Sequence, residues 1–525
     1  MKLLQTVIFL VIISLLFSCA QMSTPTGGEK DVQPPKDSLY FPSNYSTNFS
    51  SKTIEIRFDE YIKLNSANTN AVISPVMPSM PKFKVKGKRL IIELPDSLQQ
   101  NTTYSIQLPD VIQDITEGNK ISNFKYVFST GNELDSLSIS GKVIDAFTLK
   151  PMEKMLVMLY KEMSDSIIFK EKPFYLSKSN SSGAFSLSNL KEGNYKLVAV
   201  KDENSNYMFD INEEIAFVDS LIVLNKNISN INLYSFKEDH RKQLIKETKY
   251  SSPAEISIVF NKPFEKMDVS MSGKTLIYKQ TESRLKDSLK IILKAIPPQD
   301  SIFLYLSDAD FSDTIAVVKL TPIDTNLMAS KTSLIGNKQP VFKPFELLLS
   351  SPLKSIDEQN VLLTEDSLDV QINTIIKGAF DNQLVINYAW KEDASYQLYV
   401  LPEAVRSIYE ITNDTLQYSF RIMPEEDFGK VKITLFERTE NTIMELIQQE
   451  KVVKRLFISP NQNEVEFTGL VPGKYDLKMI VDENNNGYWD TGNYLSKKQA
   501  EKTYFFKGGF SVKANWEQEI KWVIE

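Results

Sequence analysis

The chain has 525 residues, of which 42% are hydrophobic and 24% are charged, and its formal net charge at pH 7 is −7. This hydrophobic content is typical of packed globular domains, which argues against wholesale disorder, and the length suits about three to five domains. An acidic chain without a concentrated basic face argues against a nucleic-acid partner.

The sequence contains one cysteine, Cys19, and one histidine, His240. A single cysteine cannot form an intrachain disulfide or a cysteine-cluster metal site. His240 lies in the charged stretch KEDHRK, where we expect a solvated linker histidine. Phosphate-binding glycine loops, G-x-S-x-G and H-E-x-x-H are also missing from the sequence. We therefore expect a protein that is not an enzyme, although scattered carboxylates such as Asp308, Asp310 and Asp313 leave a hydrolase as a remote class.

Residues 1–18 are predicted to be a lipoprotein signal peptide. Lys2 is followed by a mostly apolar run over residues 3–17, and this run is short for a membrane span, which takes about twenty residues. It ends in LFSC, which resembles a bacterial lipobox. The resemblance implies cleavage before Cys19 and transfer of diacylglycerol to its sulfur, and several acyl chains would give stable membrane attachment. A plain secretory signal and a retained anchor are the alternatives.

Residues 19–37 are predicted to be the lipidated cysteine and a flexible tether, because they are polar and contain Pro and Gly without an apolar period. The opening CAQMSTPTGGEKDVQPP resembles the start of a group of Bacteroidota lipoproteins that carry Ig-like domains. This resemblance implies the outer membrane. No dense acidic cluster follows Cys19, which favours the periplasmic side over the cell surface.

Residues 38–131 are predicted to form a β-sandwich. Ile54, Ile56 and Phe58 alternate with charged residues, which gives one buried and one wet face. The segment order TIEIRFDEYI, RLIIEL, TTYSIQL and FKYVFSTG resembles the SbsA-type bacterial Ig-like domain. Similar segments return in the same order within residues 237–325 and 326–428, which we interpret as two degenerate Ig-like domains.

A repeat with fixed spacing predicts two further modules. LKEGNYKLVAVKDENSNYMFD starts at Leu190 and LVPGKYDLKMIVDENNNGYWD starts at Leu470, an offset of 470 − 190 = 280. In each copy a Gly-x-Tyr turn leads into an alternating strand and then an Asx-rich loop. The order SGKVIDAFTLK, SSGAFSLSNL, KEGNYKLVAV resembles the prealbumin-like, or carboxypeptidase regulatory-like, β-sandwich. We assign this fold to residues 132–236 and 429–525. The predicted fold class is all-β, with tandem Ig-like and prealbumin-like sandwiches after the signal peptide and tether.

The second Asx-rich loop carries oxygen-bearing side chains at four spaced positions, which are Asp482, Asn484, Asn486 and Asp490. With Gly487 among them, the spacing resembles the first half of a calcium loop. The residue at the twelfth position is Asn493 instead of glutamate, and the preceding element is a predicted strand. Two interpretations stay open, a structural calcium site and an Asx-rich turn whose side chains satisfy its own backbone. No other cofactor is predicted.

Together these features predict a non-catalytic, lipid-anchored cell-envelope protein that acts as a scaffold or interaction module. Its partner would be a protein or an envelope polymer. The alternative is a surface-displayed glycan-binding or adhesion lipoprotein. Aromatic residues next to the Asx-rich loops could form a platform for sugar rings, although such residues more often fill the end of a sandwich; they are Trp489, Tyr488, Phe209 and Tyr207. A fold does not identify a binding site, so the sequence leaves the identity of the partner open.

Overall fold

The computed structural model describes residues 30–524 except 252–253, 272–276, 284–285, 298–300, 309–310, 319–327, 329, 393 and 437–439. The predicted signal peptide, Cys19 and most of the tether lie outside the described residues. The chain divides into two compact units. The first comprises the residues up to Val143, Pro151–Phe209 and Phe217–Leu233, and the second comprises Ile144–Lys150, Asp210–Ala216 and Tyr234–Glu525.

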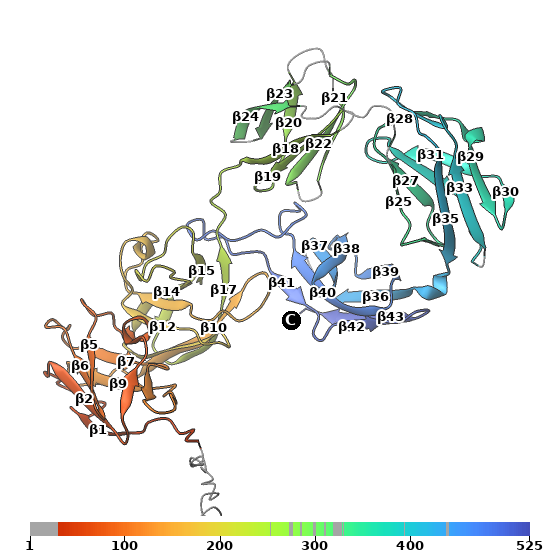
Figure 1. Ribbon diagram of the computed structural model, residues 1–525. Helices are drawn as coiled ribbons and strands as arrows, with labels where there is room; N and C mark the ends of the chain where they lie inside the picture. The colour runs from red at the N-terminus through yellow and green to blue at the C-terminus, as the bar shows by residue number, and fades with distance from the viewer. Residues whose placement is uncertain are drawn as a thin grey trace, which may run out of the picture. The chain divides into compact units, whose positions relative to one another are not determined.

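The described residues are organised as β-sheets, which confirms the predicted all-β class (Figure 1). Helical structure in them is confined to single turns, which are α2 (Ala67–Asn70), η1 (Ile167–Phe169), η2 (Glu358–Asn360) and η3 (Glu425–Asp427). Within the part of the chain that the structure describes, none of these helices has the length and apolar character that a membrane span requires.

The first unit begins with a sandwich of two sheets. One sheet has the strand order β1 (Asp37–Phe41), β2 (Thr53–Phe58), β6 (Arg89–Glu93), β5 (Lys82–Lys86), and the other has the order β4 (Val72–Ser74), β7 (Thr103–Gln107), β9 (Lys125–Ser129). A short pair, β3 (Ile62–Leu64) and β8 (Ile112–Asp114), lies beside them. Ile54, Ile56 and Phe58 on β2 are buried in the shared core, as their alternation with charged residues predicts.

The order of the four-stranded sheet recurs twice in the second unit, and the second sheet has three strands in the first of these copies and five in the other. In residues 245–318 the sheets are β18 (Ile245–Ser251), β19 (Glu255–Phe260), β22 (Ser288–Leu293), β21 (Ile277–Glu282) and β20 (Asp268–Met271), β23 (Ser301–Asp308), β24 (Phe311–Val318). In residues 330–423 they are β25 (Ser330–Thr332), β27 (Phe345–Leu349), β32 (Gln383–Asn387), β31 (Asn373–Lys377) and β26 (Lys338–Pro340), β35 (Leu416–Met423), β33 (Ser395–Val400), β29 (Val361–Glu365), β30 (Leu368–Val370). A further pair is β28 (Leu353–Ile356) with β34 (Val405–Ser407). The repeated segment order therefore corresponds to a repeated topology of the four-stranded sheet.

The second unit ends in another sandwich. Its sheets are β39 (Glu464–Leu470), β36 (Gly429–Phe436), β43 (Glu517–Val523) and β38 (Lys451–Ile458), β37 (Thr442–Gln448), β40 (Gly473–Val481), β41 (Thr503–Phe505), with β42 (Phe510–Val512) also on β40. Separate apolar cores lie within 49–128, 254–317, 328–422 and 431–522. Each core falls inside one predicted module, while the module boundaries themselves stay predictions.

The first unit also contains most strands of residues 132–236, the earlier of the two segments predicted to be prealbumin-like. There β10 (Leu137–Asp145) pairs with β13 (Ala184–Leu190), and β11 (Leu156–Tyr160) lies between β12 (Tyr175–Lys178) and β14 (Gly193–Val200), which also pairs with β16 (Ile222–Leu224). In the second unit, Glu214 and Ile215 of β15 (Glu214–Phe217) pair with Lys237 and Phe236 of β17 (Ile228–Lys237).

The two copies of the 280-residue repeat fold alike. β39 begins and ends 280 residues after β13, and β40 begins 280 residues after β14. The Tyr195 hydroxyl donates to the carbonyl of Lys191 at 2.9 Å, and the Tyr475 hydroxyl donates to the carbonyl of Val471 at 2.6 Å. The Gly-x-Tyr motif therefore marks the same turn in both places.

Candidate functional site

The structure brings together the four side chains of the predicted calcium loop. Asp482, only 1% exposed, accepts the amides of Asn486 and Gly487 at 2.9 and 3.0 Å through its two carboxylate oxygens. The side-chain amides of Asn484 and Asn486 donate to Oδ2 of Asp490 at 2.5 and 2.9 Å. The loop is thus held by its own side chains, as the Asx-turn interpretation describes.

Glu501, which no sequence motif marks, closes this loop. Glu501 is 2% exposed, and its two carboxylate oxygens accept the amides of Glu483 at 2.9 Å and Asp490 at 2.8 Å. Burial raises the pKa of Glu501 to about 7, and the nearby carboxylates of Asp490 and Asp482 raise it further against the opposing backbone hydrogen bonds. No spacing rule connects Glu501 to the loop, because it follows Asp490 by eleven residues in an irregular segment.

The calcium interpretation stays a prediction. Among the described residues, no three His, Cys, Asp or Glu side chains are arranged to hold a metal. The predicted set is of a different kind, since it contains two carboxylates and two amides. To bind calcium, Asn484 and Asn486 would have to present their side-chain oxygens, which in this structure accept the amides of Asn486 and Tyr488 at 3.1 and 3.0 Å.

The aromatic residue beside the loop is a packing element. The Trp489 ring lies 5.0 Å from the Phe147 ring, and its Nε1 donates to the carbonyl of Glu501 at 2.7 Å. Residues 144–150, which belong to the second unit, thereby contact the last sandwich, and Thr503 Oγ1 donates to the carbonyl of Ala146 at 2.8 Å. The Trp489 ring therefore packs against the last sandwich. Because its contacts with Phe147 and Glu501 already engage it, the ring does not favour a platform for sugar binding.

A buried charged row lies on the same sheet as this contact. Glu445 on β37 stands opposite both Lys478 on β40 and Arg455 on β38, and Glu445 and Lys478 are each 3% exposed. Arg455 forms an ion pair with Glu445. The Lys478 ammonium lies 2.9 Å from the centroid of the Phe147 ring. Burial lowers the pKa of Lys478 to about 8, which the Glu445 carboxylate opposes.

His240 is exposed in the irregular segment between β17 and β18, as expected for a solvated linker histidine. Its Nε2 contacts the Glu238 carboxylate, which is 7% exposed and also accepts the amide of Tyr494. His240 thus takes part in a local packing contact of the second unit. Two of the scattered carboxylates accept hydrogen bonds from backbone amides. Asp308 accepts the amides of Glu265 and Lys266, and Asp313 accepts the amide of Thr314. Asp310 lies outside the described residues.

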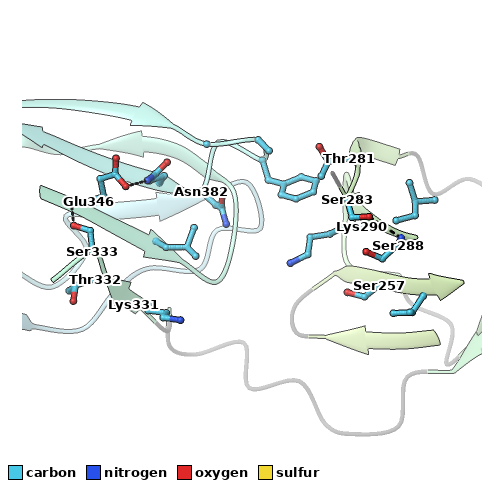
Figure 2. Close-up of a pocket in the computed structure, with 17 residues that line it drawn as sticks. Ser257, Thr281, Ser283, Ser288, Lys290, Lys331, Thr332, Ser333, Glu346 and Asn382 are labelled. Carbon is cyan, nitrogen blue, oxygen red and sulfur yellow. Dashed lines mark hydrogen bonds between the residues drawn. The ribbon is translucent and has the colours of Figure 1, made fainter. Parts of the chain in front are cut away.

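A cleft of about 650 Å³ lies inside the second unit between the sandwiches of residues 245–318 and 330–423. Figure 2 shows its two walls, with Ser257, Lys290 and Thr281 on one side and Lys331, Thr332 and Glu346 on the other. The first wall is the outer face of β19, β22 and β21, and the second consists mainly of β25, β27 and β32. No sequence pattern indicates this cleft, because its walls come from segments that share no motif.

Two contacts join the sandwiches next to the cleft. Asp381 accepts a hydrogen bond from the Tyr278 hydroxyl at 2.8 Å and pairs with the Lys279 ammonium at 2.6 Å. The Lys279 hydrogen bond is the main cause that lowers the pKa of Asp381. The Asp381 interactions form the first contact. The second is a hydrogen bond in which the Tyr409 hydroxyl donates to the carbonyl of Leu293 at 2.6 Å. These contacts hold the two walls beside each other.

Comparison with solved structures gives distant resemblances. The chain is 10% identical to the major pilin subunit BcpA of Bacillus cereus, over 75% of this chain and 99% of that one, with a TM-score of 0.14. It is 11% identical to SGBP-B of the Bacteroides ovatus mixed-linkage glucan utilization locus, over 72% and 95%, with a TM-score of 0.19. It is 10% identical to the S-layer protein rSbsC, over 89% and 66%, with a TM-score of 0.14.

No curated protein matches the chain. The comparison with protein families is more specific, and it agrees with the sandwich described at the start of the first unit. Residues 31–130 match the family of the bacterial Ig-like domain.

Proposed function

We propose that this protein is a non-catalytic, lipid-anchored component of the bacterial cell envelope that acts as an interaction module. Cys19 would carry the lipid, and the tether of residues 19–37 would separate the β-sandwiches from the membrane surface. We place it at the outer membrane, on the periplasmic side, with a protein or an envelope polymer as the partner. The tandem sandwich architecture supports this proposal, since such modules present rigid faces for binding.

The observation that carries the interaction proposal is an exposed aromatic face on the sandwich of residues 245–318. Phe303 and Tyr305 project from the same side of β23 and are 48% and 46% exposed. Val318, at 48% exposed, stands on the neighbouring strand β24 opposite Ser301, next to Phe303. Contiguous exposed apolar side chains of this kind are typical of protein–protein contact surfaces.

Site-specific crosslinking in the native envelope tests this proposal. A photo-crosslinking amino acid at Phe303 should give a discrete adduct with one envelope protein. The same amino acid at Phe41, which is 74% exposed on the first sandwich, serves as the matched control. An adduct at residue 303 that disappears in a Tyr305→Ser background supports the proposal. Equal, diffuse labelling from both positions would contradict it.

The second candidate is a glycan-binding function, and the cleft of Figure 2 favours it. Its lining contains several hydroxyl and side-chain amide groups together with exposed Leu348. Sugar rings offer both hydroxyl edges and apolar C–H faces, so such a mixed lining suits them. A glycan array probed with residues 20–525 tests this candidate. Absence of binding on the array, together with a specific adduct at Phe303, would leave only the first proposal standing.

A further inference from the structure

The polar wall of the cleft is organised by strand register. Ser257 on β19 stands opposite Lys290 on β22, and Lys290 stands opposite Thr281 on β21. These three side chains therefore form a row across the outer face of the sheet, while Ile256 and Ile258 point into the core. Two residues before Lys290 on β22, Ser288 extends the same wall. The row is a direct product of period-2 alternation.

Four hydroxyls in this cleft have no hydrogen-bond partner among the residues that the structure describes, and they are Ser257, Thr281, Ser288 and Thr332. Each is partly buried, and Figure 2 shows the first three on one wall and Thr332 on the other. Other polar groups in the lining are already engaged. Glu346 accepts from Gln383 at 2.7 Å, and Ser333 accepts the amide of Glu346 at 3.0 Å. The four hydroxyls are thus available for a ligand from both sides.

The charges around the cleft balance. Lys290 is paired with Glu255 at 3.0 Å, and the opposite wall carries Lys331 together with Glu346. Lys290 is thus balanced by Glu255, which lies next to the cleft on the same sheet, and Lys331 is balanced by Glu346, so the cleft has no net charge with which to attract an ionic ligand. Leu348, which is 46% exposed on the second wall, adds an apolar surface between Lys331 and Gln383 on the neighbouring strands.

We infer that this cleft binds a neutral oligosaccharide, an inference that rests on the glycan-binding candidate proposed above. Hydroxyl side chains on two facing walls can bond to the hydroxyl edges of a sugar chain, and Leu348 can contact its C–H face. A peptide is less suited, because it would add to a sheet through backbone groups at a strand edge. Here both walls are mainly sheet faces, whose backbone groups are paired within the sheets.

The size and construction of the cleft fit this ligand class. Its volume of about 650 Å³ lies within the usual range for small-ligand sites, about 300–1,000 Å³. The Tyr278–Asp381 and Tyr409–Leu293 hydrogen bonds hold the walls beside each other without a ligand. A cleft that is already formed lowers the entropic cost of binding a flexible sugar chain.

Affinity electrophoresis of residues 20–525 tests the inference with barley β-glucan, xyloglucan, galactomannan and soluble starch as neutral probes, and with polygalacturonate as a charged one. We expect at least one neutral polysaccharide to retard the protein and polygalacturonate to have no effect. The cleft variant combines Ser257→Ala, Thr281→Val and Thr332→Val. Loss of three hydrogen bonds should raise Kd about tenfold or more for the retarding polysaccharide.

A matched variant controls for loss of surface hydroxyls in general. Ser270→Ala, Ser312→Ala and Thr314→Val remove three exposed hydroxyls from the other sheet of the same sandwich. This control should bind within about twofold of the unchanged protein. Ser288→Trp, which fills the cleft from the surface, should abolish retardation even if the triple variant is poorly folded.

The outcomes separate the inference from the function on which it rests. Binding of a neutral polysaccharide that is equal in the cleft variant, Ser288→Trp and the control would overturn the cleft as the site, while glycan binding itself would stand. Failure of every neutral probe would overturn both. Retardation by polygalacturonate alone would overturn the assignment of a neutral ligand.

Discussion

Tyr207 and Gly487 occupy equivalent positions in two loops 280 residues apart, and both have a positive φ, +62° and +87°. Two residues before them, Ser205 and Asn485 also share a positive φ, +61° and +59°. The two Asx-rich loops therefore have the same backbone shape although one places a tyrosine where the other has glycine. In each loop an aspartate, Asp202 or Asp482, accepts the amide of that residue at 3.0 Å. The backbone shape that the two loops share therefore depends on the hydrogen bond that this aspartate accepts.

Gly487→Ala is expected to destabilise the last sandwich by about 1–3 kcal/mol. The positive φ disfavours any side chain, and the added Cβ would lie 3.2 Å from Cε1 of Phe457. Gly508 has nearly the same φ, +86°, with nothing within 4 Å of the new Cβ, so Gly508→Ala is the matched control. Chemical denaturation should show a larger loss of unfolding free energy for Gly487→Ala than for Gly508→Ala. Equal losses would mean that the Phe457 contact contributes nothing.

Local patterns in the sequence predicted much of this fold, because strand alternation and turn chemistry act over a few residues. Burial along β2 follows the alternation of Ile54 and Ile56 with charged residues, and the Gly-x-Tyr motif locates the start of β14 and β40. The missed features join distant segments. The contact of Phe147 with Lys478, the closure of the loop by Glu501 and the cleft depend on how sheets pack, which no local spacing encodes.

Folding stability should fall as the pH rises from about 4.5 to 7 because of Glu501. Its pKa in the folded protein is raised from 4.5 to about 7, so its protonated form is favoured by the fold. The contribution of Glu501 to the free energy of unfolding is complete below pH 4.5 and is lost as the pH passes 7. This contribution is at most about 3 kcal/mol. Urea denaturation across this range should show the decline. In Glu501→Gln that decline should be absent; if it persists, another group is responsible.

Calcium is expected to raise the melting temperature of residues 20–525 if the loop of Asp482 to Asp490 is a calcium site. A ligand at 100 times its Kd adds about 2.7 kcal/mol. The comparison is a melting curve at pH 7.5 with 1 mM CaCl2 (about 100-fold above a 10 µM Kd) or with EGTA. Asp490→Asn removes one carboxylate and leaves the backbone bonds of Asp482 in place. A rise in melting temperature with calcium that is present in the unchanged protein and absent in Asp490→Asn supports a calcium site. A rise below about one degree in the unchanged protein identifies the loop as an Asx turn alone.

Lys478→Met is expected to stabilise the protein at pH 7 by about 1–3 kcal/mol. The pKa of Lys478 is lowered by burial, so the charged form is disfavoured in the fold, and stability from this group rises as the pH passes 8 towards 10.5. Methionine retains the apolar contact with Phe147, and Glu445 keeps its ion pair with Arg455. Lys474→Met, on an exposed position of the same strand, should change the melting temperature little. Destabilisation by Lys478→Met would show that the ammonium over Phe147 is a net favourable contact.

Cys19→Ala is expected to release the protein from the membrane fraction. The lipid predicted at Cys19 is the only anchor proposed for the chain, and removing its sulfur removes the attachment point. Fractionation with radiolabelled palmitate should find the unchanged protein labelled and sedimenting with membranes, and the variant unlabelled. A variant that remains membrane-bound would show that the apolar run of residues 3–17 is a retained anchor.

Protease treatment of intact cells then tests which side of the outer membrane the sandwiches occupy. For the periplasmic side, we expect residues 30–524 to be protected until the outer membrane is opened, together with a periplasmic marker. Digestion on intact cells would instead favour the glycan-binding or adhesion alternative, because the cleft between β22 and β27 would then face external polysaccharides. The same samples, probed with the crosslinker at Phe303, would show whether the partner is lost with surface exposure, so the location and the partner are decided in one experiment.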